Sequence, residues 1–206
     1  MRKAVIAIVF AFAILLIFLG GELSLSFFHR WQASKLLAVV RQFQPGITTE
    51  AQARSGLKPF ARYETEDAPA SGDVKAVALS LENSPPFPWT RFSVQIDFVG
   101  GLISEINVLE MQVDKPGYPH PNSASVTEYS NRLHPLPPDF TGYSESSRTT
   151  GGVDTEGRWT GFICCHAREI RLDERATPAQ LSRSLNFRLS CMTSFTHCKD
   201  DRQILP

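Results

Sequence analysis

The chain has 206 residues, and its 21 basic and 21 acidic side chains give a formal net charge of zero. This balance excludes the basic electrostatic footprint of a nucleic-acid-binding protein, so we expect no nucleic acid among its partners. Hydrophobic residues make up 42% of the chain, which is enough for a packed core and excludes a largely disordered protein.

The N-terminus carries the strongest signal in the sequence. After Arg2 and Lys3, an apolar run begins at Ala4, continues for sixteen residues without a polar side chain and is extended by two glycines up to Gly21. As a helix, eighteen residues extend about 27 Å, close to the hydrocarbon thickness of a lipid bilayer. Residues 1–21 are therefore predicted to be a transmembrane anchor that contacts the membrane through this run.

A cleaved signal peptide and a buried helix of a soluble protein are the alternatives to an anchor. A secretory signal has an apolar core of about 7–15 residues and an Ala-x-Ala-like cleavage site. Here the run is longer, and Gly20-Gly21-Glu22 follows it instead. The basic residues before the run predict a cytoplasmic N-terminus, with the bulk of this single-pass protein outside the cytoplasm.

Two short helices are expected after a juxtamembrane segment at residues 22–30. The first has an apolar stripe at helical spacing, formed by Ala33, Leu36, Leu37, Val40 and Phe43. Pro45-Gly46 ends this helix, because proline cannot continue it and glycine accepts a left-handed cap. Thr49 and Gln52 have the spacing of a capping box, which predicts the start of the second helix.

Strict alternation then predicts strands. Apolar residues occupy every second position from Phe92 to Phe98, and Gly100-Gly101 predicts a tight hairpin turn. In the returning strand the apolar positions change from even numbers, up to Val108, to odd numbers, from Leu109 onward, which predicts a bulge. Three more strands are expected at residues 77–81, 159–170 and 185–191.

Helices that precede strands predict an α+β fold, with an antiparallel sheet of about five or six strands. We expect this extracytoplasmic domain to occupy residues 31–206. Pro, Gly, Ser and Thr are frequent at about residues 115–157, which are predicted to form a long loop.

The four cysteines are disulfide candidates, because thiols in an exported domain meet an oxidising compartment. Cys191 and Cys198 would close a short loop. Cys164 and Cys165 are adjacent on an expected strand, so their side chains point to opposite faces and cannot easily reach the same partner. Four cysteines allow three connectivities, among which spacing alone does not choose. We predict at least one disulfide, with Cys191–Cys198 as the favoured pair.

The same segment has six potential metal ligands in Cys164-Cys165-His166, Cys191 and His197-Cys198. The chain has no Cys-x2–4-Cys knuckle, nucleophile elbow or glycine-rich phosphate loop. We therefore predict no catalytic residue, no bound metal and no cofactor, and expect that the protein is not an enzyme. A metal-dependent or hydrolytic envelope enzyme that uses this Cys/His-rich C-terminal segment is the alternative.

A local resemblance accompanies these patterns. Residues 31–57, with Pro45-Gly46-Ile47-Thr48-Thr49-Glu50-Ala51, are similar to the helix–turn–helix opening of BamE-type bacterial envelope proteins. The lipid-accepting cysteine of that family is missing here, so its outer-membrane role is not carried over. The whole layout, up to the acidic ending before Leu205-Pro206, resembles uncharacterised single-pass membrane-anchored proteins of environmental bacteria. The resemblance implies a fold and a location, and no activity.

Taken together, the patterns predict a binding or structural module of the cell envelope. We expect its partner to be an envelope protein or a cell-wall component, bound through an edge of the sheet or through the long loop.

Overall fold

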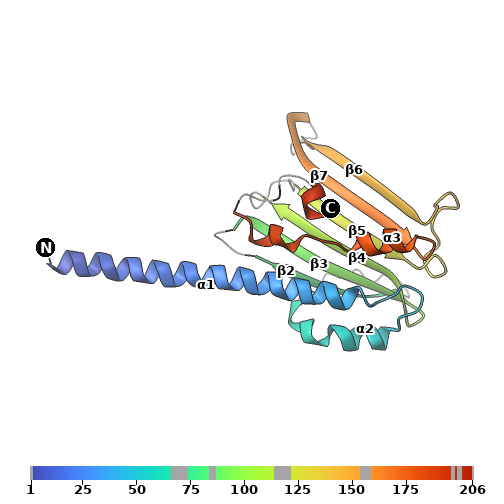
Figure 1. Cartoon of the computed structure of the whole chain (residues 1–206), viewed down its shortest axis with the longest axis horizontal. Helices are drawn as coiled ribbons and strands as arrows, with labels where there is room; N and C mark the ends of the chain where they lie inside the picture. Colours follow the sequence, from blue (N-terminus) through green and yellow to red (C-terminus); the bar gives the residue numbers. More distant parts are fainter. Residues whose placement is uncertain are drawn as a thin grey trace.

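The computed structural model describes residues 2–65, 74–83, 87–113, 122–153, 159–195, 198 and 201–205. A long helix, α1 (Arg2–Val40), leads into a domain with a seven-stranded sheet and several short helical segments. The predicted α+β fold class is thus confirmed. The N-terminal half of α1 projects away from the domain, whereas its C-terminal part lies against it (Figure 1).

The helix α1 is continuous through the expected anchor and the expected juxtamembrane segment at residues 22–30. No proline interrupts residues 2–44, so nothing in this part of the sequence breaks the backbone hydrogen-bond ladder. The predicted apolar stripe is present and buried from Ala33 to Val40. It belongs to the end of one long helix, which corrects the expectation of a separate short one.

The second predicted helix is α2 (Glu50–Leu57), and its capping box is confirmed. The Thr49 hydroxyl oxygen accepts a hydrogen bond from the Gln52 backbone at 3.2 Å, and the Gln52 side chain accepts one from the Thr49 backbone at 2.9 Å. The turn between α1 and α2 needs Gly46, whose φ is +78° and whose backbone N–H donates to the carbonyl oxygen of Ile103 at 2.7 Å. A short 3₁₀ segment, η1 (Lys58–Tyr63), follows α2.

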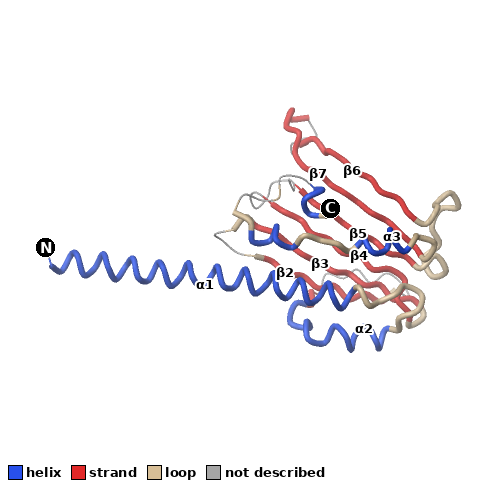
Figure 2. The backbone as a smooth tube through the Cα atoms, viewed as in Figure 1, coloured by secondary structure: helices blue, strands red, loops and turns tan. Residues whose placement is uncertain are grey.

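Figure 2 shows the strands side by side as one sheet. Their order is β1-β2-β3-β4-β5-β7-β6, and every neighbouring pair is antiparallel except β5–β7, which is parallel. The strands are β1 (Glu64–Thr65), β2 (Lys75–Glu82), β3 (Trp89–Val99), β4 (Leu102–Val113), β5 (Asn122–Tyr129), β6 (Tyr143–Val153) and β7 (Trp159–Asp173). The remaining segments are α3 (Pro178–Ser184), η2 (Leu189–Thr193) and α4 (Asp201–Ile204).

The expected long loop at residues 115–157 is wrong, because β5 and β6 both lie within it. Their sequences are rich in serine and threonine and lack a long apolar alternation. Pairing with β4 and β7 places them in the sheet, since strand formation depends more on neighbours than on intrinsic preference. These two strands raise the strand count above the expected five or six.

The hairpin between β3 and β4 is confirmed. Gly100 and Gly101 both have positive φ, at 59° and 79°, which fits the tight turn that the sequence predicts. Phe92, Val94, Ile96 and Phe98 are all buried on the face of the sheet that packs against α1, called the inner face below. The outer face is the opposite one.

The predicted bulge lies elsewhere than expected. The register shift is at Ser104, between the β3 pairings of Ile103 and Glu105, whereas pairing is regular through Val108 and Leu109. The change in apolar positions has another cause: Leu109 lies on the outer face, and the buried inner positions that follow Val108 hold Glu110 and Gln112.

The strand expected at residues 185–191 is also wrong. Leu185, Phe187, Leu189 and Cys191 are buried, and the residues between them are more exposed, as alternation predicts. However, the segment packs onto the inner face and ends as η2 instead of pairing with a strand. The ring of Phe187 contacts the ring of Phe92 edge-on, with centroids 6.0 Å apart. Alternating burial here reflects an extended chain lying across a sheet.

Cys191 and Cys198 form a disulfide, the pair favoured by the sequence, with their Cα atoms 5.4 Å apart. Cys164 and Cys165 lie on β7, but their side chains are outside the described part of the structure, as is His197.

A lysine substitution should destabilise the protein strongly on the inner face of β3 and only weakly on its outer face. Ile96→Lys should bury an ammonium group among apolar side chains and lower the free energy of unfolding by more than about 3 kcal/mol. Gln95→Lys places the same group on the outer face beside Asp97, whose carboxylate accepts a hydrogen bond from Gln95, and should cost less than about 0.5 kcal/mol. Denaturant titration of both variants checks the register, and equal losses would contradict it.

The disulfide predicts a further stability difference. In the chain-entropy model, a bond that closes so short a loop contributes roughly 2–3 kcal/mol, so Cys191→Ser should lower the free energy of unfolding by about that amount. Adding a reductant should destabilise the wild type and leave the variant unchanged. Mass spectrometry after alkylation without reduction should find Cys191 and Cys198 unmodified, and alkylation of all four cysteines would refute the bond.

Candidate functional site

A cavity of about 520 Å³ lies between the C-terminal end of α1, the turn that follows it, α3, and the ends of β5 and β7. We call it the distal cavity, because it lies at the end of the sheet farther from the projecting half of α1. Its volume is within the range of small-molecule sites. Half of the residues that line it are apolar, namely Phe43, Pro45, Ile47, Leu172, Leu181 and Leu185.

Local sequence signals hold the walls of the distal cavity in place. The helix α3 begins with a capping box formed by Thr177 and Gln180, and Pro178 occupies its first turn. Arg41, at the end of α1, donates two hydrogen bonds to the carbonyl oxygen of Leu185, at 2.5 and 3.2 Å. This cation therefore joins α1 to the segment that follows α3.

Glu128 places a carboxyl group in this apolar setting. It pairs with Ile106 of β4 and Leu172 of β7, so its side chain points to the inner face. The Ser184 hydroxyl donates a hydrogen bond to Glu128 Oε1 at 3.1 Å. Burial raises the pKa of Glu128, and the hydrogen bond from Ser184 opposes that rise. The cavity thus contains an acid whose protonation is sensitive to what binds beside it.

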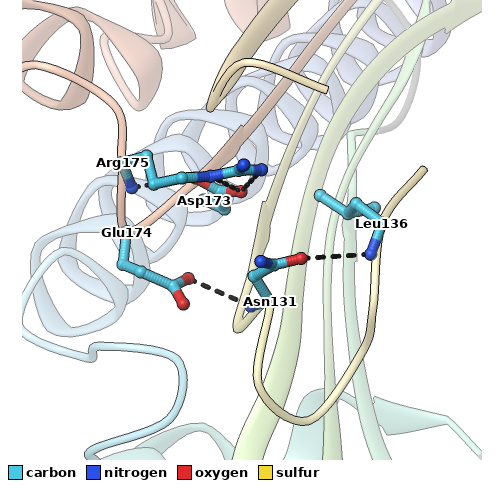
Figure 3. A network of polar contacts seen from close by, with 5 residues as sticks. All are labelled: Asn131, Leu136, Asp173, Glu174 and Arg175. Carbon is cyan, nitrogen blue, oxygen red and sulfur yellow. Dashed lines mark hydrogen bonds and ion pairs between the residues drawn. The ribbon is translucent and has the colours of Figure 1, made fainter. Parts of the chain in front are cut away.

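Two of the acidic residues that line the cavity, Asp173 and Glu174, are paired with neighbouring residues (Figure 3). Arg175 contacts the fully buried carboxylate of Asp173, with its Nη2 2.5 Å from Oδ2. Burial would raise the pKa of Asp173, but hydrogen bonds from the Arg175 side chain and backbone hold it below its ordinary value. Glu174 accepts a hydrogen bond from the Asn131 backbone at 3.0 Å, and Asn131 accepts one from the Leu136 backbone at 3.2 Å. These contacts join the segment that follows β7 to the segment that follows β5.

A second polar group lies inside the opposite end of the sheet. Glu110 is fully buried, and neither of its carboxyl oxygens has a hydrogen-bond partner in the described structure. Burial raises its pKa to about 8, and the charge of Arg30 opposes the shift. Nearby, the Gln112 side chain accepts a hydrogen bond from the Cys198 backbone N–H at 3.2 Å. The Asn122 side chain donates a hydrogen bond to the Cys198 carbonyl oxygen at 2.7 Å. The amides therefore position the disulfide loop.

The structure separates the residues that the sequence grouped as possible ligands. Cys191 and Cys198 are bonded to each other, so neither is a free thiolate. For Cys164, Cys165 and His166 the structure describes the strand backbone only. In the described part of the chain, no group of three or more His, Cys, Asp or Glu side chains is arranged to hold a metal ion.

Glu128 and Arg41 were missed by the sequence reasoning, although a signal for Glu128 exists. Ala124 and Val126 are buried at every second position of β5, and Glu128 continues the same parity. A carboxylate at an inward position of a strand is unusual enough to mark a site. Arg41 gives no such signal, because its role depends on Leu185, which is distant in sequence.

The buried Glu110 predicts a pH-dependent stability. Its raised pKa means that the folded protein keeps a proton which the unfolded chain releases between about pH 4.5 and pH 8, so the free energy of unfolding falls as pH rises through this window. Glu110→Gln should match the wild type at pH 4 and exceed its stability above pH 8, by up to about 5 kcal/mol. Denaturant titrations from pH 4 to pH 9 provide the test, and parallel curves for the two proteins would contradict it.

Comparison with known proteins gives no relative: no protein-family model, no curated protein and no solved structure matches the chain. The local similarity of residues 31–57 to BamE-type proteins therefore stays a prediction.

Proposed function

We propose that this protein is a single-pass membrane protein of the cell envelope whose domain binds a partner outside the cytoplasm. The observation that carries the proposal is the contrast along α1. Its most apolar eighteen-residue stretch is long enough to cross a membrane, and none of that stretch is buried within the described protein. Phe10 and Ile17, for example, are 69% and 76% exposed. Burial of each such side chain is worth about 1.5–3 kcal/mol, which lipid supplies and water does not.

Two features favour an extracytoplasmic domain. Arg2 and Lys3 precede the apolar stretch, and positive charge favours the cytoplasmic side. The disulfide between Cys191 and Cys198 fits an oxidising compartment, where such bonds persist. Both features support the same orientation independently of each other.

The distal cavity supports binding rather than catalysis. A serine nucleophile is commonly activated by an adjacent histidine base within hydrogen-bond reach. Glu128 has the hydroxyl of Ser184 beside it, and no histidine is among the described residues that line the cavity. An apolar group that carries an amine fits the site. The apolar walls bury the carbon atoms of the group, and an ionised Glu128 accepts a hydrogen bond from its amine nitrogen. Such a group can be a side chain of an envelope protein or part of a cell-wall component.

The membrane assignment predicts how the full chain fractionates. We expect it to sediment with membranes and to resist carbonate extraction, because the apolar half of α1 spans the bilayer. A reporter fused after Pro206 should be active outside the cytoplasm only. A soluble mature protein that begins near Glu22 would instead show a cleaved signal.

The cavity assignment predicts pH-dependent binding of dansylcadaverine, an apolar fluorophore with a pentylamine. For the full chain in lipid nanodiscs, affinity should rise with pH, because the amine binds the ionised form of Glu128 and burial raises the pKa of that group. Glu128→Gln should abolish the pH dependence, and Leu181→Arg should weaken binding about tenfold by placing a cation in the lining.

Glu169→Gln is the matched control, because Glu169 lies on the outer face and pairs with Arg171 at 2.6 Å. This variant should bind the probe like the wild type, after subtraction of the signal from empty nanodiscs. Equal affinity of the wild type, Glu128→Gln and Leu181→Arg at every pH would show that the probe does not bind in the distal cavity.

A further inference from the structure

Aromatic side chains from three distant parts of the chain gather at the end of the sheet next to the anchor. We call this group the aromatic collar, and it consists of Phe27, Phe28, Trp31, Phe87 and Phe195. Phe87 is buried at its centre: its ring centroid lies 4.5 Å from that of Phe195 and 6.0 Å from that of Phe27. The other four members are 37–66% exposed. An exposed apolar cluster of this kind marks an interaction surface.

Cations accompany the exposed rings. Lys35 Nζ lies 3.7 Å from the centre of a Trp31 ring, and the guanidinium of Arg62 lies 5.2 Å from the centre of the Phe28 ring. Lipid headgroups are the setting in which Lys and Arg extend past aromatic rings toward anionic groups, while tryptophan stays at the boundary with the acyl chains. The composition of the collar thus fits a lipid interface better than a purely apolar protein groove.

The distance along α1 agrees with this location. Phe27 follows Gly21 by six residues, about 9 Å along the helix axis, which places its Cα just beyond the polar zone of a bilayer, roughly 5–8 Å deep on each side. Helical side chains point back toward the N-terminus, which brings the rings of Phe28 and Trp31 closer to the anchor than their Cα atoms are. The collar is also continuous with the apolar surface of the anchor through Leu25, which is 42% exposed.

The disulfide loop brings the last member of the collar to this surface. Phe195 lies between Cys191 and Cys198, and its exposed fraction of 66% is the largest in the collar. The loop is attached to α1 by Arg30, whose Nη1 donates to the Thr193 hydroxyl at 2.9 Å. It is also attached to Asn83, the residue after β2, whose Nδ2 donates to the Met192 carbonyl oxygen at 2.6 Å. A ring that is held this firmly and left exposed is positioned for a partner.

We propose that the aromatic collar inserts into the headgroup region of the leaflet from which α1 emerges. The inference rests on the proposed membrane anchor and adds to it a second, shallow contact between domain and bilayer. Two contacts on one surface fix the tilt of the domain, so that the distal cavity points away from the membrane.

Fluorescence quenching by brominated lipids tests this contact in the full chain. The protein is reconstituted in vesicles of phosphatidylethanolamine and phosphatidylglycerol, with bromine on the acyl carbons nearest the headgroup. We expect Trp31→Phe to lose a quenched component of the emission. Adding Phe195→Trp to that variant should restore a component at least twofold more quenched than the remaining tryptophans, because position 195 touches the interface.

Leu181→Trp, added to Trp31→Phe in the same way, is the matched control at the distal cavity and should add only unquenched emission. If the chain resists carbonate extraction but the tryptophan at position 195 is no more quenched than the one at position 181, the collar does not touch lipid and the inference is wrong. Crosslinks between copies at position 195 without quenching would equally overturn it in favour of a second copy. Release of the chain by carbonate would refute the anchor itself.

Discussion

The contact between the end of α1 and the inner face of the sheet is the one on which the rest of the structure depends. Ala33, Leu36 and Val40 are fully buried there, at successive turns of the same helix whose first half is exposed and apolar. The domain is therefore joined to a membrane-length segment through packed side chains and a continuous backbone, with no flexible linker between them. Helices of this length are cooperative, and a packed apolar stripe is what stabilises their ends.

This arrangement gives the two ends of the sheet different chemistry. At the end nearer the exposed half of α1, buried amides and the disulfide hold a loop that exposes Phe195, and the carboxyl group of Glu110 is buried in the sheet. At the far end, Arg41 and α3 enclose an apolar cavity around Glu128. Both carboxyl groups have raised pKa values caused by burial. Glu128 lines the distal cavity and can therefore contact a ligand. Glu110 is fully buried in the core.

Local patterns in the sequence predicted the elements that local interactions decide. The capping box at Thr49, the glycine turn after Val99 and the buried face around Ile96 all depend on residues within a few positions of each other. The same patterns misled where distant contacts decide. The alternation that ends at Cys191 belongs to a chain lying across the sheet, and the polar strands β5 and β6 form because β4 and β7 pair with them. The distal cavity depends on contacts between distant residues, such as the hydrogen bond from Arg41 to the Leu185 carbonyl oxygen. Local sequence patterns could not predict such contacts.

The central claim is that α1 continues unbroken from the membrane into the domain. Hydrogen–deuterium exchange of the full chain in lipid nanodiscs measures this directly, through the amides of residues 22–32 between the anchor and the packed stripe. Continuous protection across these residues, comparable with that of residues 33–40, is the predicted result. Rapid exchange confined to residues 22–32, with protection on both sides, would show a flexible linker there and would contradict the account.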